Sequence, residues 1–401
     1  MPQIDYSAKL LDMEGIEIKD VVQKSSHIEL RFRMRLIEHV CPQCHTITNI
    51  VHDYRLQMVK DIPFQGKPVH WLYEKRRYRC PLCGKRFYER NYLLPKFHRI
   101  TNRTAMFCLI RLQDKCSRKD VARSLGVSQS TVARWMQLVD YGKPTKLPKV
   151  LSIDEFRGNT DAGKFQCILT SPKDKTIVDI LPDRTAAHIL DYLKTFPNRD
   201  QVKYVVMDMN KEYLRLTQIL FKNAIIVIDR FHVVRHCTWA LENVRKRVQK
   251  TLLAEQRKYF KRSRALLLAH MNKLSDENKQ VVEQILLFSR DLREAYLLKE
   301  AFYRFMDSTD SVQAKQRLRE FRLYAFTADI PEFNSCLTML ENWEPYILNA
   351  FDCSYSNGFT EGVNNTIKVI KRIAYGYRSF VNFRSRILIT LNANRVPITL
   401  T

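Results

Sequence analysis

The sequence of 401 residues contains no apolar run approaching the roughly 18–20 residues that a membrane-spanning helix requires. Its first residues, MPQIDYSAKLLDMEG, carry acids where a signal peptide has a basic start and an apolar middle. We therefore expect a cytoplasmic protein with no membrane partner. Acidic residues are also scarce, 42 against 67 Lys and Arg, which leaves a net charge of +25. That imbalance excludes a generic acidic cytosolic enzyme and predicts a polyanionic partner, above all nucleic acid.

The composition is that of a folded chain. Hydrophobic residues make up 45% and aromatic residues 11%, which is enough for at least one sizeable core. At roughly 100–200 residues per domain, the length suggests about two to four domains. The positive charge is concentrated in residues 60–103, with twelve Lys and Arg against three acids, and in residues 361–401, with seven against one. The Pro- and Lys-rich segment 142–149 is typical of a linker.

Four of the ten cysteines form two C-x-x-C pairs, Cys41 with Cys44 and Cys80 with Cys83. Without a secretion signal, disulfides are not expected. Two such pairs supply the four thiolates of a tetrahedral zinc site, and β-like runs at 70–73 and 78–80 fit a zinc-ribbon-like module. Two alternatives stay open. Residues 41–45 also match the C-x-x-C-H pattern of haem attachment, and the cysteines could remain reduced and unmetallated.

Cations alternate with aromatic residues around the second cysteine pair, from residue 75 to residue 90. Such a surface suits contact with phosphate groups and bases. The residues that we expect to bind DNA here are Arg76, Arg77, Lys85 and Arg86. The alternative is an ordinary solvated surface.

Residues 117–139, SRKDVARSLGVSQSTVARWMQLV, have the spacing of a helix-turn-helix. Ala122 is small enough for two helices to approach closely, and Gly126 permits the left-handed turn between them. Ser117 and Ser128 are N-cap candidates. The second helix would read the major groove, led by Gln129, Ser130, Thr131 and Arg134. The alternative is a three-helix packing unit that does not touch DNA.

Beyond residue 149, short apolar runs alternate with helical patterns, which favours an α/β sheet covered by helices. Strands are expected at 150–153, 165–170, 176–181, 202–207 and 224–228. Helices are expected at 185–196 and 213–221, and the chain from about 235 to 350 is helical in pattern.

Two carboxylates end strands of this region, Asp154 after the first and Asp208 after the fourth. Strand-end acids on adjacent strands can share a divalent cation, and Mg²⁺ or Mn²⁺ prefers carboxylate oxygen. Glu361 would complete a two-metal site for phosphodiester chemistry. On a helix, Glu361, Asn364 or Asn365, Lys368 and Arg372 would share one face. Each acid alone would more often be a cap or a surface charge.

Several motifs together resemble a known family: CPQC…CPLCGKRF, LSIDEF, VVMDMN, IDRFHVVRH and SNGFTEGVNNTIKVIKRIAYGYRSF. The sequence resembles bacterial insertion-sequence transposases of the DDE class, specifically the ISL-three group. The resemblance implies a multidomain α/β fold with a ribonuclease H-like catalytic core, an all-α insertion, a zinc-ribbon-like module and a helix-turn-helix. The expected divisions are a zinc module at 1–98, the helix-turn-helix at 99–141, the linker at 142–149, the core at 150–240 and 351–401, and the helical insertion at 241–350.

By this resemblance, Asp154, Asp208 and Glu361 match the catalytic triad and bind Mg²⁺ or Mn²⁺. Asp229 and His232 resemble a D-x-x-H element. His232 would position the scissile phosphate, or it is a core histidine bonded to Asp229. Asp229 is the rival of Asp208 for the place of the second acid in the catalytic triad. Beyond Glu361 on the same expected helix, the residues that we expect to bind DNA are Lys368, Lys371 and Arg372.

The implied activity is binding of terminal inverted repeats, metal-assisted cleavage and joining of 3′ ends to target DNA. A homodimer associated with the nucleoid is expected, because two element ends must be paired. Two alternatives are a DNA-binding regulator on a transposase scaffold without catalysis, and a ribonuclease H-like nuclease or resolvase.

Overall fold

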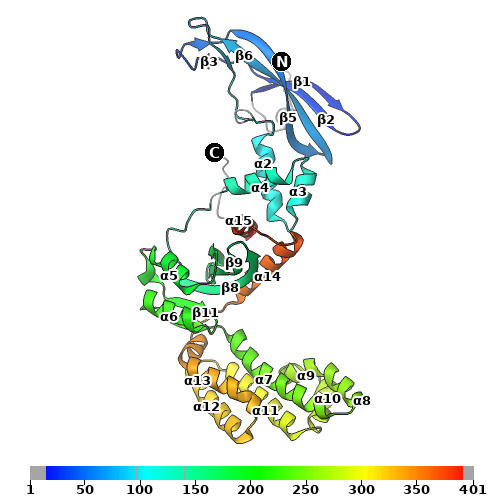
Figure 1. Ribbon diagram of the computed structural model, residues 1–401, viewed down its shortest axis with the longest axis vertical. Helices are drawn as coiled ribbons and strands as arrows, with labels where there is room; N and C mark the ends of the chain where they lie inside the picture. Colours follow the sequence, from blue (N-terminus) through cyan, green and yellow to red (C-terminus); the bar gives the residue numbers. More distant parts are fainter. Residues whose placement is uncertain (1–14, 95–97, 140, 392–401) are drawn as a thin grey trace. The chain divides into compact units, whose positions relative to one another are not determined.

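The computed structural model describes residues 15–94, 98–139 and 141–391, apart from the side chains of residues 259 and 261 (Figure 1). The chain forms two compact units. The first comprises Met1–Gly142 with Ile367–Thr401, and the second comprises Lys143–Thr366. The expected start of the zinc module at residue 1 and the expected end of the core at residue 401 lie outside the described residues.

The first unit contains a five-stranded sheet in the order β1-β2-β6-β5, with β7 beside the end of β6. Strands β2 and β6 run parallel, and the other pairs are antiparallel. Val69, Trp71 and Tyr73 alternate along β6 and so point to one face, where Phe32 stacks on Tyr73 at 5.1 Å between ring centroids. The two runs expected at 70–73 and 78–80 are parts of one strand. The strands are β1 (Ile16–Gln23), β2 (Ile28–Met34), β5 (Val51–Phe64), β6 (Lys67–Arg79) and β7 (Arg86–Tyr88), with a small ladder of β3 (His39–Val40) and β4 (Ile47–Thr48).

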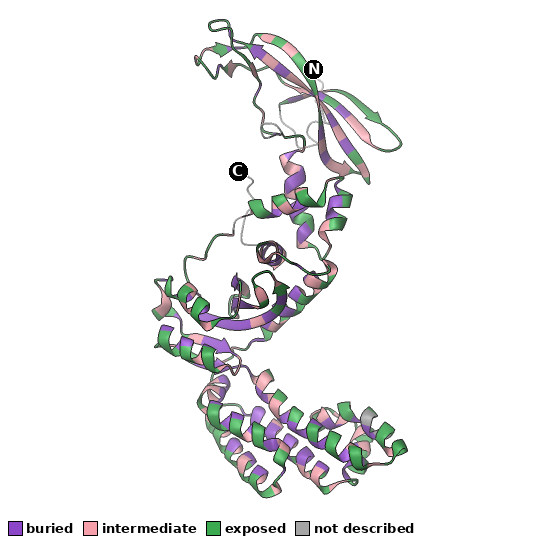
Figure 2. Ribbon diagram, in the orientation of Figure 1, coloured by how far each residue is buried: buried purple, intermediate pink, exposed green. Residues whose placement is uncertain are grey.

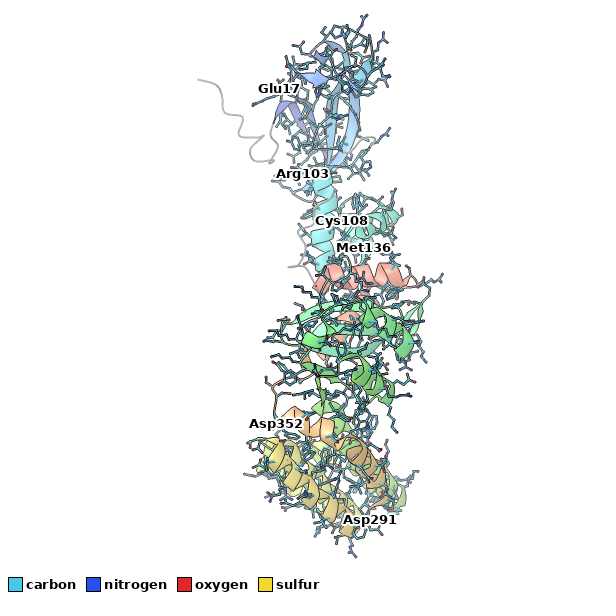
Figure 3. All side chains as sticks on the ribbon, turned by 90° about the vertical axis from the view of Figure 1, so that its left-hand side faces the viewer. Glu17, Arg103, Cys108, Met136, Asp291 and Asp352 are labelled. Carbon is cyan, nitrogen blue, oxygen red and sulfur yellow. The ribbon has the colours of Figure 1, made fainter. Side chains whose placement is uncertain are left out.

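Helices α2 (Asn102–Gln113), α3 (Arg118–Ser124) and α4 (Gln129–Leu138) follow. Gly126 has φ +62°, as a left-handed turn between α3 and α4 requires. The predicted caps are present, because Ser117 accepts from the Asp120 N–H and Ser128 from the Thr131 N–H. The helices enclose a small core, in which Figure 3 labels Cys108 of α2 and Met136 of α4.

Helix α15 (Phe380–Leu391) packs with these three helices in the first unit, whereas the sequence placed residues 351–401 in the expected core. Ile389 is buried in the core of α2, α3 and α4. The Arg386 guanidinium donates to the carbonyls of Asp114 at 3.0 Å and Cys116 at 2.7 Å. These carbonyls lie just beyond the end of α2, so α15 caps that helix. The residues from Ile367 onward therefore belong to the first unit.

The second unit is built on a sheet in the order β10-β9-β8-β11-β12. The hairpin strands β8, β9 and β10 are antiparallel, whereas β11 runs parallel to both β8 and β12. All five expected strands are present. The elements are β8 (Val150–Thr160), β9 (Gly163–Ser171), β10 (Thr176–Leu181), α5 (Ala186–Lys194), β11 (Tyr204–Met207), α6 (Lys211–Leu220) and β12 (Ile225–Ile228).

The segment expected to be a linker has no helix or strand before residue 150, but it is packed on the second unit. Leu147 is buried, and its backbone N–H and carbonyl both bond the Asn198 side chain at 2.9 Å. These paired bonds hold the segment in place, so it is not a freely extended spacer.

The expected boundary between core and insertion at residue 241 falls inside helix α7, which runs unbroken from Arg230 to Thr251. The helices from α7 to α13 share a buried core with the sheet. Figure 2 shows buried positions along these helices in purple. None of the described helices is long and apolar enough to cross a membrane. The helices are α7 (Arg230–Thr251), α8 (Ala254–Arg262), α9 (Arg264–Leu268), α10 (Asp276–Leu286), α11 (Arg290–Met306), α12 (Ser311–Ala328) and α13 (Asn334–Leu348), and α14 (Gly358–Ile373) follows the insertion.

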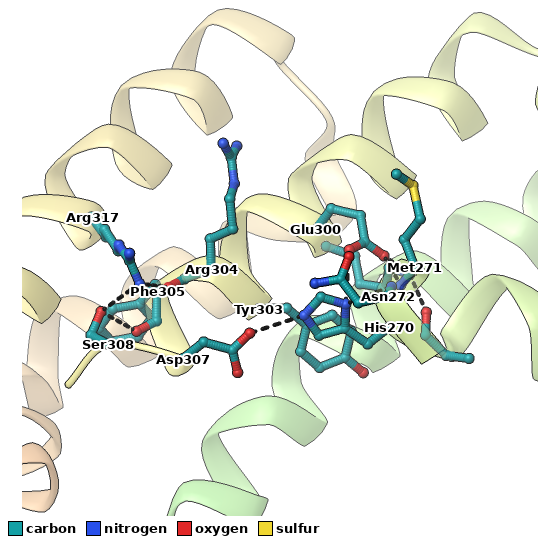
Figure 4. Close-up of polar contacts among 12 residues, drawn as sticks. His270, Met271, Asn272, Glu300, Tyr303, Arg304, Phe305, Asp307, Ser308 and Arg317 are labelled. Atoms are coloured by element: carbon teal, nitrogen blue, oxygen red, sulfur yellow. Dashed lines mark hydrogen bonds and ion pairs between the residues drawn. The ribbon is translucent and has the colours of Figure 1, made fainter. Parts of the chain in front are cut away.

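Polar contacts tie the connection between α9 and α10 to α11 (Figure 4). His270 Nε2 lies 3.0 Å from Asp307, and the imidazole ring stacks on Tyr303 with centroids 4.8 Å apart. The Met271 N–H donates to Glu300 at 3.0 Å. This connection has few apolar side chains to bury, so these bonds fix its position.

Candidate functional sites

The four cysteines of the two pairs lie together in the first unit. Their sulfur atoms are all within 4.8 Å of one another, with 3.6 Å between Cys41 and Cys83 and 3.4 Å between Cys44 and Cys80. Tetrahedral zinc with Zn–S bonds of about 2.3 Å separates its sulfurs by about 3.8 Å. The donor set and its spacing therefore fit one structural zinc ion.

The two knuckles have the same backbone geometry. His45 N–H donates to the Cys41 carbonyl at 3.0 Å, and Gly84 N–H donates to the Cys80 carbonyl at 3.1 Å. His45 and Gly84 both have positive φ, 59° and 69°. His45 thus occupies the turn position that Gly84 occupies in the other knuckle. The histidine that suggested haem attachment has a role in the turn, and both thiols before it face the second cysteine pair.

The cations near the second knuckle differ in exposure. Lys85 and Arg86 are exposed, and Arg77 is half-buried and paired with Asp53. Arg76 is 2% exposed and lies 3.5 Å from the buried carboxylate of Glu89. The prediction that Arg76 contacts DNA is therefore wrong, because its side chain has no access to a ligand from solvent.

The start of α4 presents the residues predicted to read the major groove. Gln129, Ser130 and Arg134 are exposed, and Thr131 is half-buried. Arg134 donates to the Thr131 hydroxyl at 3.2 Å, which orients its guanidinium along the helix surface. The polar face of the helix is therefore open to solvent.

Three aspartates follow three neighbouring strands at one level of the central sheet. Strand register pairs Ile153 of β8 with Met207 of β11, and Met207 with Ile228 of β12. The residues directly after these are Asp154, Asp208 and Asp229. Asp154 does not end its strand, as the sequence had suggested, because β8 continues in its hairpin with β9 to Thr160. Asp154 lies where the pairing of β8 with β11 ends, so it is still at the same level of the sheet as Asp208.

His232 joins two of these carboxylates. It lies in the first turn of α7, and its Nδ1 is 3.0 Å from Asp208 and 3.4 Å from Asp229. Asp208, Asp229 and His232 form a group whose ligand atoms are within 4.8 Å of one another. Hydrogen bonding to Asp208, and next to Asp229, raises the pKa of His232 to about 10. The imidazole is therefore cationic at neutral pH and offsets part of the negative charge.

The surroundings of Asp154 disfavour the ionised form of its carboxyl group. Burial, followed by the charge of Asp208, raises the pKa of Asp154 to about 7, because both effects oppose ionisation. Its Oδ1 accepts from the Glu155 N–H at 2.7 Å, and its Oδ2 accepts from the Asn364 side chain at 2.9 Å. Asn364 is itself buried, and among the described residues its Oδ1 has no hydrogen-bond partner.

Two asparagines bond the acids, one just before helix α14 and one within it; the sequence had placed only Asn364, as an alternative to Asn365, on the face of Glu361. Asn357, just before the helix, donates its backbone N–H to Asp229 at 3.1 Å and its side chain to Asp208 at 3.4 Å. Asn364 reaches Asp154. Glu361 is half-buried on the turn between them. The motif SNGFTEGVNN was the available signal, since it places polar residues on both sides of Glu361.

The two candidates for the second acid have different surroundings. Asp229 is 4% exposed and is bonded by His232 and the Asn357 backbone, whereas the Asp208 side chain is 31% exposed. Asp208 also lies on the middle strand, between β8 and β12. Its accessibility and central place favour Asp208 as the acid that faces a ligand.

An open pocket of about 490 Å³ is lined by Arg184, Thr185, Asn210, Lys211 and Glu212. The last three of these residues follow Asp208 closely in the sequence. The Arg184 guanidinium forms an ion pair with Glu155 at 2.6 Å.

The cations farther along α14 are assigned to the first unit. Lys368 and Arg372 are exposed and Lys371 is half-buried.

Comparison with known families agrees with each of these parts. A model described as the zinc-finger of transposase IS204/IS1001/IS1096/IS1165 matches residues 37–83, and one described as the helix-turn-helix domain of transposase family ISL3 matches residues 93–139. A third, the transposase model of the same group, matches residues 151–387. The combined parts define a transposase. More particularly, the chain belongs to the ISL3 family.

Individual relatives are similar over different lengths. The transposase for insertion sequence element IS1001 of Bordetella parapertussis is 28% identical over 84% of this chain and 85% of its own length. The transposase for IS1557 of Mycobacterium tuberculosis is 26% identical over 43% of this chain and 44% of its own. A Lactococcus lactis protein named ATP-dependent protease is 35% identical over 34% of this chain and 39% of its own. Only the first covers most of the chain.

Proposed function

We propose that the chain is a DDE transposase that cleaves DNA at the ends of an insertion sequence and joins the 3′ ends to target DNA. The observation that supports this most is the convergence of Asp154 and Asp208 at one level of adjacent parallel strands. Glu361 would be the third acid, on α14. The strand order β10-β9-β8-β11-β12, with only β11 and β12 parallel to β8, supports a ribonuclease H-like core.

The residues present fit a divalent cation. Asp154 has a raised pKa because water is excluded and a second carboxylate is close, and a bound cation would favour the ionised form of both acids. Asp154, Asp208 and Glu361 would hold it. When bound, Mg²⁺ or Mn²⁺ activates water or a 3′-hydroxyl and stabilises charge on the phosphate.

The chain's own groups would orient these acids. Asn364 and the Glu155 N–H fix the two oxygens of Asp154, and Asn357 holds Asp208 and Asp229. His232, cationic and 25% exposed, would attract the scissile phosphate while it remains bonded to Asp208. In this role His232 would be a bonded histidine that also faces the DNA.

DNA would be held through several surfaces. The start of α4 would read the terminal inverted repeat, with Gln129, Ser130, Thr131 and Arg134 in the major groove. Lys85, Arg86 and the partly paired Arg77 would contact phosphates, as would Lys368, Lys371 and Arg372. The proposal includes a homodimer, since two element ends must be brought together.

A cleavage assay tests this function. Duplexes that contain the ends of the surrounding element are incubated with the full-length protein, with and without Mg²⁺. We expect Mg²⁺-dependent cleavage that Asp208→Asn abolishes, with end binding within about twofold of wild type. Asp191→Asn is the matched control, because its carboxylate on α5 is 76% exposed. Unchanged cleavage by the Asp208 variant would contradict the assignment. Binding without cleavage by the wild type would favour the alternative, a DNA-binding regulator.

A further inference from the structure

Helix α7 presents a row of aromatic and cationic side chains to solvent immediately after the acid cluster. Phe231 is 57% exposed and Trp239 is 49% exposed. Arg235 lies between them in sequence and is also exposed. Positions four residues apart fall on one face of a helix, so these three side chains lie in a row along one side of α7. We call them the α7 ladder.

The α7 ladder does not belong to the hydrophobic core. The opposite face of the helix buries Val233, Cys237, Ala240 and Leu241 against the sheet and the other insertion helices. That face already supplies the packing that stabilises the helix. Two large aromatic rings on the solvent side therefore need another explanation, and an exposed apolar surface of this kind commonly marks a binding site.

The members of the ladder are preorganised. The Arg235 guanidinium lies over the Trp239 ring, 4.3 Å from its centroid. The Trp239 ring is also 5.9 Å from the His236 ring. Among the residues that the structure describes, Arg235 forms no ion pair, so its charge is available to an anion. A guanidinium stacked on an indole keeps its edge free for phosphate.

The ladder begins at the acids. The Phe231 ring meets the His232 ring edge-to-face, with centroids 5.4 Å apart and an interplanar angle of 89°. His232 in turn lies 3.0 Å from Asp208. At about 1.5 Å per residue, Phe231 and Trp239 are about 12 Å apart along the helix, close to the length of three stacked nucleotides at about 3.4 Å each.

We propose that the α7 ladder is a stacking platform for unpaired nucleobases of the DNA strand that leaves the acid cluster. This inference rests on the proposed function and adds a base-binding site to it. Aromatic faces accept any base, and the positive charge of Arg235 matches the phosphates between the bases. A fully paired duplex has no free base faces, so the platform would favour DNA that is unpaired next to the cut.

The test measures binding without cleavage. The full-length Asp208→Asn protein is titrated, at fixed salt and without added Mg²⁺, into two DNAs that carry the same terminal sequence. One is fully paired, and the other has three unpaired nucleotides at the cleavage position with 2-aminopurine among them. We expect tighter binding of the unpaired DNA and quenching of 2-aminopurine by stacking.

Trp239→Ala and Phe231→Ala should each weaken binding of the unpaired DNA about 5- to 100-fold, and leave the paired DNA within about twofold. Trp239→Phe and Phe231→Tyr, which keep an aromatic face, should retain most of the affinity and fold in any case. Phe326→Ala is the control, because Phe326 on α12 is 85% exposed and lies outside the ladder.

Equal losses on both DNAs, or no loss on either, would overturn the proposal, as would unquenched 2-aminopurine with the wild-type ladder. These outcomes are distinct from failure of the proposed function, which is judged by cleavage with the ladder intact. Preference for unpaired DNA that depends on the ladder, together with absence of Mg²⁺-dependent cleavage by the wild-type protein, would support the site while refuting the transposase chemistry.

Discussion

Replacement of Asp154 by Asn should stabilise the metal-free protein at pH 8. Asp154 is 8% exposed, and its pKa in the folded protein is about 7 against an ordinary value of 3.8. That difference corresponds to about 4 kcal/mol by which the folded structure disfavours the ionised carboxylate. Asn removes the charge at nearly the same volume. We therefore expect an increase of up to about 4 kcal/mol in the free energy of unfolding at pH 8.

The direction of the pH dependence follows from the raised pKa. The folded protein holds the Asp154 proton more tightly than the unfolded chain does. The stabilisation that comes from this more tightly held Asp154 proton is thus fully present below about pH 4 and is lost as the pH rises through about 7. The raised pKa of His232 acts in the same direction but at higher pH, between about 6.5 and 10, and it is present in both proteins. Asp154→Asn and wild type should therefore differ much less at pH 5 than at pH 8.

The hydrogen bonds around the position allow the substitution. The new side-chain oxygen can still accept from the Glu155 N–H, as Asp154 Oδ1 does at 2.7 Å. The new NH₂ group would face the donor of Asn364, but the Oδ1 of Asn364 is buried and has no partner among the described residues. A flip of the Asn364 amide then forms a bond from the new NH₂ group to that oxygen.

Thermal unfolding of the purified protein at pH 5 and pH 8, without divalent cations, measures the effect. For a unit of about 200 residues, each kcal/mol moves the midpoint by about 2–4 °C, so the upper limit is about 15 °C. Asp191→Asn, an exposed carboxylate, should change neither value by more than about 1 °C. Destabilisation at pH 8, or an equal gain at both pH values, would refute the electrostatic reasoning.

Two further predictions concern the zinc module. Cys80→Ser should reduce zinc content from about one equivalent to near zero by metal analysis and unfold the knuckles; a wild-type protein without zinc would refute the site. Arg86→Ala should leave stability unchanged and reduce the salt dependence of DNA binding by about one phosphate contact. Arg76→Ala should destabilise the sheet by about 3–5 kcal/mol, because it leaves the buried Glu89 carboxylate without the guanidinium charge, although the Tyr73 hydroxyl and the backbone N–H of residue 76 still donate to it. Similar effects of the two arginine variants on unfolding would show that Arg76 is not buried as described.

The acids could be located from sequence because they depend on local order. Asp154, Asp208 and Asp229 each follow a short apolar strand, and parallel strands bring their carboxyl ends to one edge of a sheet. The asparagines were harder, since Asn357 and Asn364 reach Asp208 and Asp154 across 149 and 210 residues of sequence. No local pattern specifies such a contact.

The basic stretch of β6 shows a second reason why the sequence alone could not predict the exposure of its cations. Along this strand the buried residues are Val69, Trp71 and Tyr73, and then Arg76 and Tyr78, so the buried side changes after Tyr73. Tyr78 packs against His39 with ring centroids 4.6 Å apart, which shows that the other side is covered at the zinc end of the strand. A count of charges along the strand cannot reveal which face is covered, and it therefore assigned Arg76 to the surface.

The position of α15 sets the order in which this protein can complete its helix-turn-helix module during synthesis. Helices α2, α3 and α4 leave the ribosome first, but their core also needs Ile389, and the end of α2 needs Arg386. At roughly 5–20 residues per second, the roughly 240 residues between α4 and α15 take on the order of 10–50 s to translate. A chain that stops early would have all the helix-turn-helix residues but lack the helix that finishes their packing. Asp154, Asp208 and Glu361 are therefore always synthesised before the helix-turn-helix module is complete.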